Sequence, residues 1–182
     1  MGDTHQHYEV LFVSAIFSRH DDALAWATEA MQRTWGPIAL TSDAFSFADT
    51  EYYTETMGPA LRKQFVAFEK PFAPERLVDA KLHTNALELE YGAIGDHTEQ
   101  RPLNIDPGYL TEAKLVLAST KDRDHRIYLA EGIFAEVTLH FARGNLQSLP
   151  WTYPDYQRAD YHAFFTACRE YLRTRYRTPK HL

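Results

Sequence analysis

The segment YEVLFVSAIF, residues 8–17, is the stretch that decides the fold. It is a nearly continuous apolar run rich in Val, Ile and Phe, which is typical of a strand covered on both faces. Apolar residues then recur at helical spacing from Leu24 to Trp35, before Gly36-Pro37. We therefore expect a central buried strand at residues 10–14 that is followed by a packed helix.

Further strands and helices follow along the chain. Extended segments are expected at residues 38–40, 44–48, 60–70, 101–110, 113–120, 126–132 and 133–144. Helices are expected at residues 73–92 and in a C-terminal segment where Phe164, Phe165, Cys168, Tyr171 and Leu172 share one face. The polar segment 119–126 is interpreted as the loop of a hairpin. The predicted fold class is α+β, a mixed and mostly antiparallel sheet packed with about three helices.

The domain organisation is simple. With 182 residues, 45% of them hydrophobic and 24% charged, the composition is that of one globular domain. We expect one domain at residues 8–176, a disordered tail at residues 1–7 and a C-terminal tail at residues 177–182. No linker or repeat interrupts this pattern.

Several features bear on the compartment and the partners. No apolar run approaches the roughly 20 residues that span a bilayer, and the N-terminal segment lacks the features of a secretory signal. The single cysteine, Cys168, is interpreted as a buried small apolar residue. A cytoplasmic protein without a membrane partner is expected.

The charge is unevenly distributed along an acidic chain. The net charge is −6, yet residues 151–182 hold six Lys and Arg against three Asp and Glu. The basic end suits cations near the negative end of a helix dipole, with an RNA-binding patch as the alternative. Because nucleic-acid binding needs a basic footprint, the acidic body makes such a partner the least favoured.

Known catalytic and cofactor motifs are missing. The sequence has no phosphate-binding glycine loop, no nucleophile elbow and no cysteine or histidine cluster with metal-ligand spacing. No metal site is therefore predicted, and the cofactor stays unknown.

The segment NIDPGY, residues 104–109, is interpreted as a rigid turn. Pro107 fixes its own φ and Gly108 permits a positive φ. The turn would hold Asn104 and Asp106 on one face, with Arg101 in reach. Either it is an ordinary β-turn or it presents a fixed carboxylate at a pocket mouth.

The helix at residues 73–92 carries a polar row beside its apolar stripe. The row consists of Lys81, Asn85 and Glu88. The expected stripe consists of Val78, Leu82, Ala86 and Leu89. The row is either a solvated face with a marginal ion pair or part of a ligand site.

The segment GIFAEVTLHF, residues 132–141, alternates like a strand. Glu136, Thr138 and His140 fall on the face opposite Ile133 and Leu139. No Lys or Arg stands between Gly132 and Phe141, so this face is interpreted as the wall of a polar pocket. A buried carboxylate needs a partner, and we expect Glu136 to pair with a basic residue and to share a cavity with Asp106.

A family resemblance covers about residues 8 to 175. Its motifs are TEYYTETMG (50–58), KLHTNALE (81–88), NIDPGY, LASTKD (117–122), GIFAEVTL (132–139) and WTYPDY (151–156). Taken together they resemble a bacterial family catalogued as a conserved domain of unknown function. The resemblance implies a single domain in a stand-alone bacterial cytoplasmic protein and carries no mechanism.

The preferred hypothesis is a small-molecule enzyme or ligand-binding domain for a polar anionic metabolite that carries carboxylate or phosphate. The candidate catalytic residues are Asp106, Glu136 and His140. The candidate ligand-binding residues are Lys81, Asn85, Glu88, Arg101, Asn104, Tyr109, Lys121, Thr138 and Tyr153. The alternatives are an interaction or regulatory domain, with a homodimer as one form, and an RNA binder using the C-terminal arginines. The sequence leaves open whether the protein is an enzyme.

Overall fold

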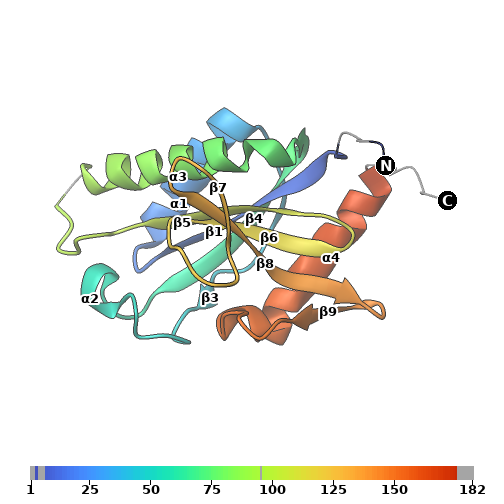
Figure 1. The fold of residues 1–182 in the computed structure, drawn as a ribbon. Helices are drawn as coiled ribbons and strands as arrows, with labels where there is room; N and C mark the ends of the chain where they lie inside the picture. The colour runs from blue at the N-terminus through green and yellow to red at the C-terminus, as the bar shows by residue number, and fades with distance from the viewer. Residues whose placement is uncertain (1–2, 4–6, 95, 176–182) are drawn as a thin grey trace.

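The computed structural model describes residues 3, 7–94 and 96–175, and Figure 1 shows how they fold. The described strands are β1 (Val10–Ser18), β2 (Ile38–Thr41), β3 (Phe45–Ser46), β4 (Arg62–Phe72), β5 (Asn104–Leu110), β6 (Lys114–Ser119), β7 (Ile127–Ala130), β8 (Ile133–Ala142) and β9 (Asn145–Ser148). The helices are α1 (Asp21–Trp35), α2 (Thr54–Met57), α3 (Leu77–Gly92) and α4 (Ala159–Arg175). The predicted tails fall outside this part of the chain, apart from residues 3 and 7.

The strands form one sheet in the order β2-β4-β1-β5-β6-β8-β7, with β3 paired to β4 and β9 paired to β8. Every strand pairing within the described residues is antiparallel. The predicted α+β class and the mostly antiparallel sheet are confirmed, and the described strands show no parallel pairing.

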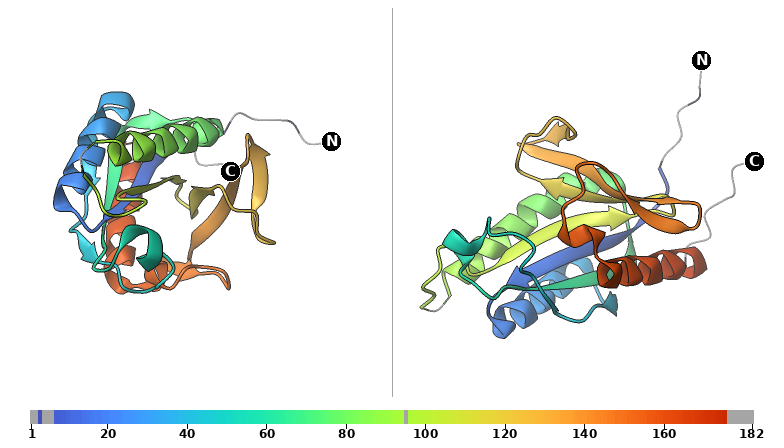
Figure 2. Two further views of the ribbon diagram at one scale, coloured as in Figure 1. Left: turned by 90° about the vertical axis from the view of Figure 1, so that its left-hand side faces the viewer. Right: turned by 90° about the horizontal axis from the view of Figure 1, so that it is seen from below.

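The central strand β1 is buried along its whole length, as its apolar run predicted. Phe12 and Ile16 face one side of the sheet and pack with residues of α1 and α3. Val13 and Ala15 face the other side and pack with residues of α4. Because side chains alternate along a strand, β1 contributes to a hydrophobic core on each face of the sheet. Helices α1 and α3 lie on one face, and α4 covers the opposite face (Figure 2).

The sheet opens between β5 and β6. Their pairing covers Gly108 to Leu110, opposite Leu117 to Leu115, and does not extend to the first residues of β5. At Gly108 the strands are so close that an added Cβ would lie 2.3 Å from the Val116 carbonyl oxygen. Before Gly108, at residues 104–107 of β5, the two strands are not paired. Side chains of α3 contact the backbone of β5 through this opening.

The segment NIDPGY is therefore strand β5, not a turn. Asp106 pairs with Ala15 and Pro107 with Ser14 of β1. Pro107 can occupy a strand here because β6 does not pair at this position, so no hydrogen bond from that side is lost. Gly108 is needed for close approach, not for a positive φ.

The predicted hairpin at residues 119–126 is also wrong. Strands β6 and β7 do not pair with each other, since both pair with β8, which lies between them. The polar segment crosses from β6 to β7 over the end of the sheet and becomes part of the pocket wall.

Helix α3 buries a different face from the predicted one. Its buried residues are Leu77, Ala80, Lys81, Thr84, Leu87 and Tyr91. Two members of the expected stripe, Leu82 and Leu89, are 36% and 78% exposed. The sequence prediction placed the polar row that contains Lys81 beside the apolar stripe. In the structure Lys81 is buried, because its side chain enters the opening of the sheet and contacts β5.

A β-bulge breaks the alternation of β8. Leu115 of β6 pairs with Leu139, but the next residue, Val116, pairs with Val137, so Thr138 is the extra residue. Glu136 and Leu139 consequently share a face, and His140 points to the other one. The single-face assignment for Glu136, Thr138 and His140 is therefore wrong.

Candidate functional site

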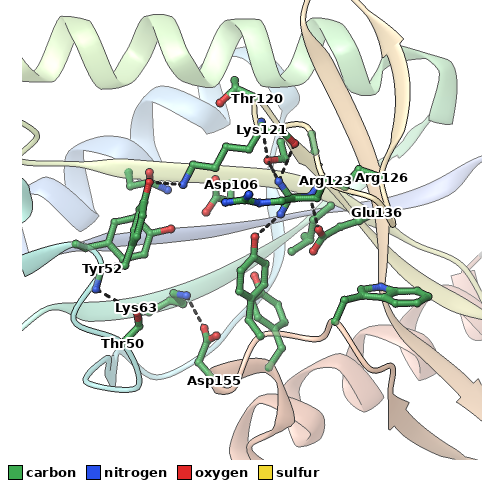
Figure 3. A pocket seen from close by; sticks show the side chains of 18 of the residues that line it. Thr50, Tyr52, Lys63, Asp106, Thr120, Lys121, Arg123, Arg126, Glu136 and Asp155 are labelled. Atoms are coloured by element: carbon green, nitrogen blue, oxygen red, sulfur yellow. Dashed lines mark hydrogen bonds and ion pairs between the residues drawn. The ribbon is translucent and has the colours of Figure 1, made fainter.

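A polar cavity of about 420 Å³ occupies the open end of the sheet. Strands β4, β5, β6 and β8 supply its floor through Lys63, Asp106, Leu117 and Glu136. The walls come from α3, from the segment before α2, from the β6–β7 connection and from residues 151–156. The cavity thus collects side chains that lie far apart in the sequence (Figure 3).

Six cations and five carboxylates line this cavity. The cations are Lys63, Lys81, Arg101, Lys121, Arg123 and Arg126. The carboxylates are Asp49, Glu88, Asp106, Glu136 and Asp155. Such a concentration of ionised groups in a semi-enclosed space requires close pairing, because an unpaired buried charge is costly.

One buried pair joins Lys63 of β4 to Asp155. The Nζ–Oδ2 distance is 2.6 Å, and both side chains are buried. Lys63 Nζ also lies 3.6 Å from the centre of the Phe47 ring. Burial lowers the pKa of Lys63, while the adjacent Asp155 carboxylate opposes this effect. Asp155 is thus the counter-ion of a buried lysine.

A second network ties α3 to β5. Lys81 Nζ donates to the carbonyl oxygen of Ile105 at 2.9 Å and to Asp106 Oδ1 at 3.1 Å. Glu88 Oε1 accepts a hydrogen bond from the Ile105 N–H at 2.8 Å, and its Oε2 lies 3.1 Å from Arg101. Lys81 and Glu88 therefore satisfy the backbone groups of Ile105 that no strand pairs.

The two carboxyls of this network differ in pKa. Burial raises the pKa of Glu88, and the charge of Lys81 only partly offsets it. Burial also acts to raise the pKa of Asp106, but the charges of Lys81 and Lys63 outweigh it and the pKa is lowered. Asp106 is therefore an ionised carboxylate at neutral pH, and its side chain is 30% exposed.

The third network surrounds Glu136, which is only 3% exposed. Its Oε2 lies 2.7 Å from Arg126 Nε and 3.1 Å from His125 Nε2. Its Oε1 accepts a hydrogen bond from Thr138 at 3.2 Å. The expected pairing of Glu136 with a basic residue, on the same cavity as Asp106, is confirmed.

The Arg126 guanidinium donates hydrogen bonds to several residues around the cavity. Besides Glu136, it donates to Ser119 Oγ and to the Lys121 carbonyl oxygen, each at 2.8 Å, and to the Tyr153 hydroxyl. Burial raises the pKa of Tyr153, with the Glu136 charge acting in the same direction. Arg126 consequently fixes the path of the β6–β7 connection above the cavity.

The mouth is formed by Tyr52, Lys121 and Arg123. Lys121 Nζ donates to the Tyr52 hydroxyl at 2.7 Å and lowers the pKa of Tyr52. Figure 3 shows the Lys121 side chain extended toward Tyr52. Within the described part of the chain, Arg123 has no ion pair or side-chain hydrogen bond.

The structure brings together nine of the twelve residues selected from the sequence. Those that line the cavity are Lys81, Asn85, Glu88, Arg101, Asn104, Asp106, Lys121, Glu136 and Tyr153. Thr138 lies behind the wall, hydrogen-bonded to Glu136. The other two are corrections: the bulge directs His140 away from Glu136, and Tyr109 packs into the cores beside Val116 and Leu77. His140 and Tyr109 do not line the cavity.

Sequence reasoning missed four important members of the site. Lys63 lies in a strand whose sequence shows no sign of a functional site, and its counter-ion, Asp155, is 92 residues away in the sequence. Arg123 and His125 fall in the segment that was taken for a hairpin loop. The available signal was the density of charge in KDRDHR, residues 121–126.

The alternative partners receive less geometric support. Arg173 pairs with Glu112 and Glu170, and Arg169 donates to the Glu112 carbonyl oxygen. The last part of the basic C-terminal segment, residues 176–182, falls outside the described residues. No helix in the described part of the chain has the length and apolar character needed to cross a membrane.

The fold and the site define an α+β protein with a charge-rich polar cavity at the open end of an antiparallel sheet. The chain belongs to the family described as "Domain of unknown function (DUF4416)", whose model matches residues 8–171. No curated protein and no solved structure matches the chain.

Proposed function

We propose that this protein binds a small anionic metabolite, with a carboxylate or phosphate group, in the polar cavity. The observation that carries the proposal is the excess of cations at the mouth. Each cavity carboxylate has a cationic partner, whereas Lys121 and Arg123 have no carboxylate partner among the described residues. An acidic chain that directs unneutralised cations into a concave site is suited to an anionic ligand.

The chemistry of Asp106 favours binding over proton transfer. Its Oδ1 is engaged by Lys81, and its Oδ2 has no hydrogen-bond partner within the described residues. A carboxylate with a lowered pKa is a weak general base near neutral pH but a good acceptor for a ligand hydroxyl or amine. The proposed ligand thus combines an anionic group with at least one donor group.

Glu136 supports the site in this proposal and does not react. Both of its oxygens accept hydrogen bonds from protein groups, and Arg126 is the strongest of these partners by distance. Its role is to hold Arg126, and through it the connection that carries Lys121 and Arg123.

A thermal-shift screen tests the proposal, with inorganic phosphate, citrate, a sugar phosphate and a nucleoside monophosphate as probes. A ligand specific for the native state raises the melting temperature by mass action. For the probe that does so, Arg123→Gln should weaken binding about tenfold or more, as loss of a charged hydrogen bond implies. Arg33→Gln, an exposed change on α1, is the matched control. The proposal fails if no anion stabilises the wild type or if Arg123→Gln binds as tightly as the control.

One observation favours a second function, an interface with another copy of this chain. Strand β7 ends the sheet, and Ile127, Tyr128 and Leu129 are 70%, 59% and 41% exposed. An exposed apolar edge strand can pair with the same strand of a second copy. Light scattering on the purified protein tests this, since a dimer should dissociate in the variant Leu129→Lys and a monomeric wild type would exclude the interface.

A further inference from the structure

Three metal-ligating side chains converge away from the cavity. His20 directly precedes α1, and His97 and Glu99 lie in the connection from α3 to β5. One ligand atom from each of the three lies within 4.8 Å of those of the other two. Because His20 is 77 residues from His97, no spacing in the sequence could reveal the cluster.

The distance between two of the ligands suits a shared ion. His20 Nε2 and Glu99 Oε2 are 3.2 Å apart. Two ligands of one tetrahedral zinc ion, with bonds near 2.1 Å, stand about 3.4 Å apart. Arg19 takes the other oxygen, Oε1, at 2.8 Å and so orients the carboxylate without blocking Oε2.

His97 supplies a second and independent observation. Its Nε2 is enclosed and has no hydrogen-bond partner within the described residues. Leaving such a nitrogen unsatisfied is unfavourable, and an ion bound to it would remove this cost. The ring is held in place against Tyr91, with centroids 4.9 Å apart, and the Tyr91 hydroxyl donates to Asp22.

We propose that His20, His97 and Glu99 bind one divalent transition-metal ion of the zinc class. Two imidazoles and a carboxylate suit Zn²⁺, Co²⁺ or Ni²⁺ better than Ca²⁺ or Mg²⁺, which prefer oxygen ligands. Three protein ligands leave a position for water or another small ligand. The ion ties the start of α1 to the segment that carries Arg101 into the cavity.

Isothermal titration calorimetry with Zn²⁺ alone, on chelator-treated full-length protein, tests this proposal. The wild type should bind one ion per chain, and His97→Ala and Glu99→Gln should each weaken binding at least tenfold. His83→Ala and His7→Ala serve as controls and should bind as the wild type does. Co²⁺ provides a second measurement, because its visible absorption reports coordination by the protein directly.

The variant His20→Gln distinguishes loss of a metal ligand from loss of the fold. The His20 side chain makes no cap hydrogen bond to α1, so this variant should keep the wild-type circular dichroism spectrum and still lose the ion. The proposal is overturned if the three ligand variants bind Zn²⁺ as tightly as the wild type. It is equally overturned if His7→Ala or His83→Ala abolishes binding, since the ion would then sit elsewhere.

Discussion

Glu88 on α3 accepts a hydrogen bond from the backbone N–H of Ile105 on β5, with 2.8 Å between Oε1 and N. Lys81, about two turns earlier on the same face of the helix, donates to the carbonyl oxygen of the same residue at 2.9 Å. In an antiparallel sheet a neighbouring strand would occupy both groups. Two side chains of a helix replace that strand, and the sheet can therefore remain open where the cavity lies.

Replacing Glu88 should destabilise the protein through this contact. Glu88→Ala leaves a backbone N–H unsatisfied, and we expect a loss of about 1–3 kcal/mol in the free energy of unfolding. Glu88→Gln keeps an acceptor oxygen and should lose less. Urea denaturation measures both variants, with the exposed Glu90→Ala on the same helix as the control. A Glu88→Ala variant as stable as the control would contradict the role of the carboxylate.

The buried pair of Lys63 and Asp155 should behave as a coupled unit. Lys63→Met or Asp155→Asn alone leaves a buried charge without its partner, and a loss of about 3–5 kcal/mol is expected. The double variant should lose clearly less than the two single losses together. A double-mutant cycle in urea measures the coupling, and the exposed pair of Arg76 and Asp79, 3.8 Å apart, provides the comparison. Additive losses at Lys63 and Asp155 would contradict the pairing.

The sequence predicted those elements whose local pattern agrees with their tertiary environment. The apolar run of β1, the stripe of α1 and the strand at residues 60–70 were all confirmed. On α3 the pattern misled, because Leu82 and Leu89 lie on the solvent side while Lys81 enters the opening between strands. Periodicity cannot reveal an opening that depends on where two strands separate.

The candidate site shows the same limit. Paired polar residues with close spacing, such as Asn104 and Asp106, were found from the sequence. The bulge at Thr138 was not, because one extra residue in a strand leaves no mark on composition. That bulge alone moves His140 from the predicted pocket wall to the opposite face.

Gly108 should be intolerant of any side chain. A Cβ at this position would lie 2.3 Å from the Val116 carbonyl oxygen, and the backbone of β6 cannot move aside without breaking its pairing. We expect Gly108→Ala to cost about 3 kcal/mol or more by overpacking. Gly92→Ala is the control, since its nearest atom would be 3.8 Å away. Equal melting temperatures for the two variants would contradict the close approach.

Cys168 should be inert in the native protein. It is fully buried on α4, and burial raises the pKa of its thiol well above the usual range. Since the thiolate is the reactive form, a thiol reagent at pH 8 should modify it only after unfolding. The rate of modification with and without urea measures this. Rapid reaction without denaturant would show that α4 opens readily or that the thiol is exposed.

Lys121 should control the ionisation of Tyr52. The hydrogen bond from Lys121, followed by its charge, lowers the pKa of the Tyr52 phenol. Lys121→Met removes both effects, and the pKa of Tyr52 should rise toward 10, the ordinary value. NMR titration of the tyrosine ring carbons measures the change, with Lys114→Met as the control. An unchanged Tyr52 titration would show that the contact across the cavity mouth does not persist in solution.

The opposite pKa shifts of Glu88 and Asp106 predict opposite dependences of stability on pH. Glu88 has a raised pKa in the folded state, so its contribution is present below the unfolded value and is lost as pH rises through the folded pKa. Asp106 has a lowered pKa, so its contribution is present above the unfolded value and is lost as pH falls through the folded pKa. The two groups share one cation, Lys81, yet respond in opposite directions because burial prevails at Glu88 and charge prevails at Asp106.

Urea denaturation of the wild type, Glu88→Gln and Asp106→Asn between pH 3 and pH 7 tests this contrast. Neither amide titrates, so each difference from the wild type isolates one carboxyl group. As pH rises from about 4, the ordinary carboxyl range, toward 7, the stability of Glu88→Gln should improve relative to the wild type. As pH falls from about 5 toward 3, the stability of Asp106→Asn should improve relative to the wild type. If the stability differences of both variants from the wild type changed in the same direction with pH, the proposed environments would be contradicted. A carboxyl group with a raised pKa and one with a lowered pKa must give opposite pH dependences.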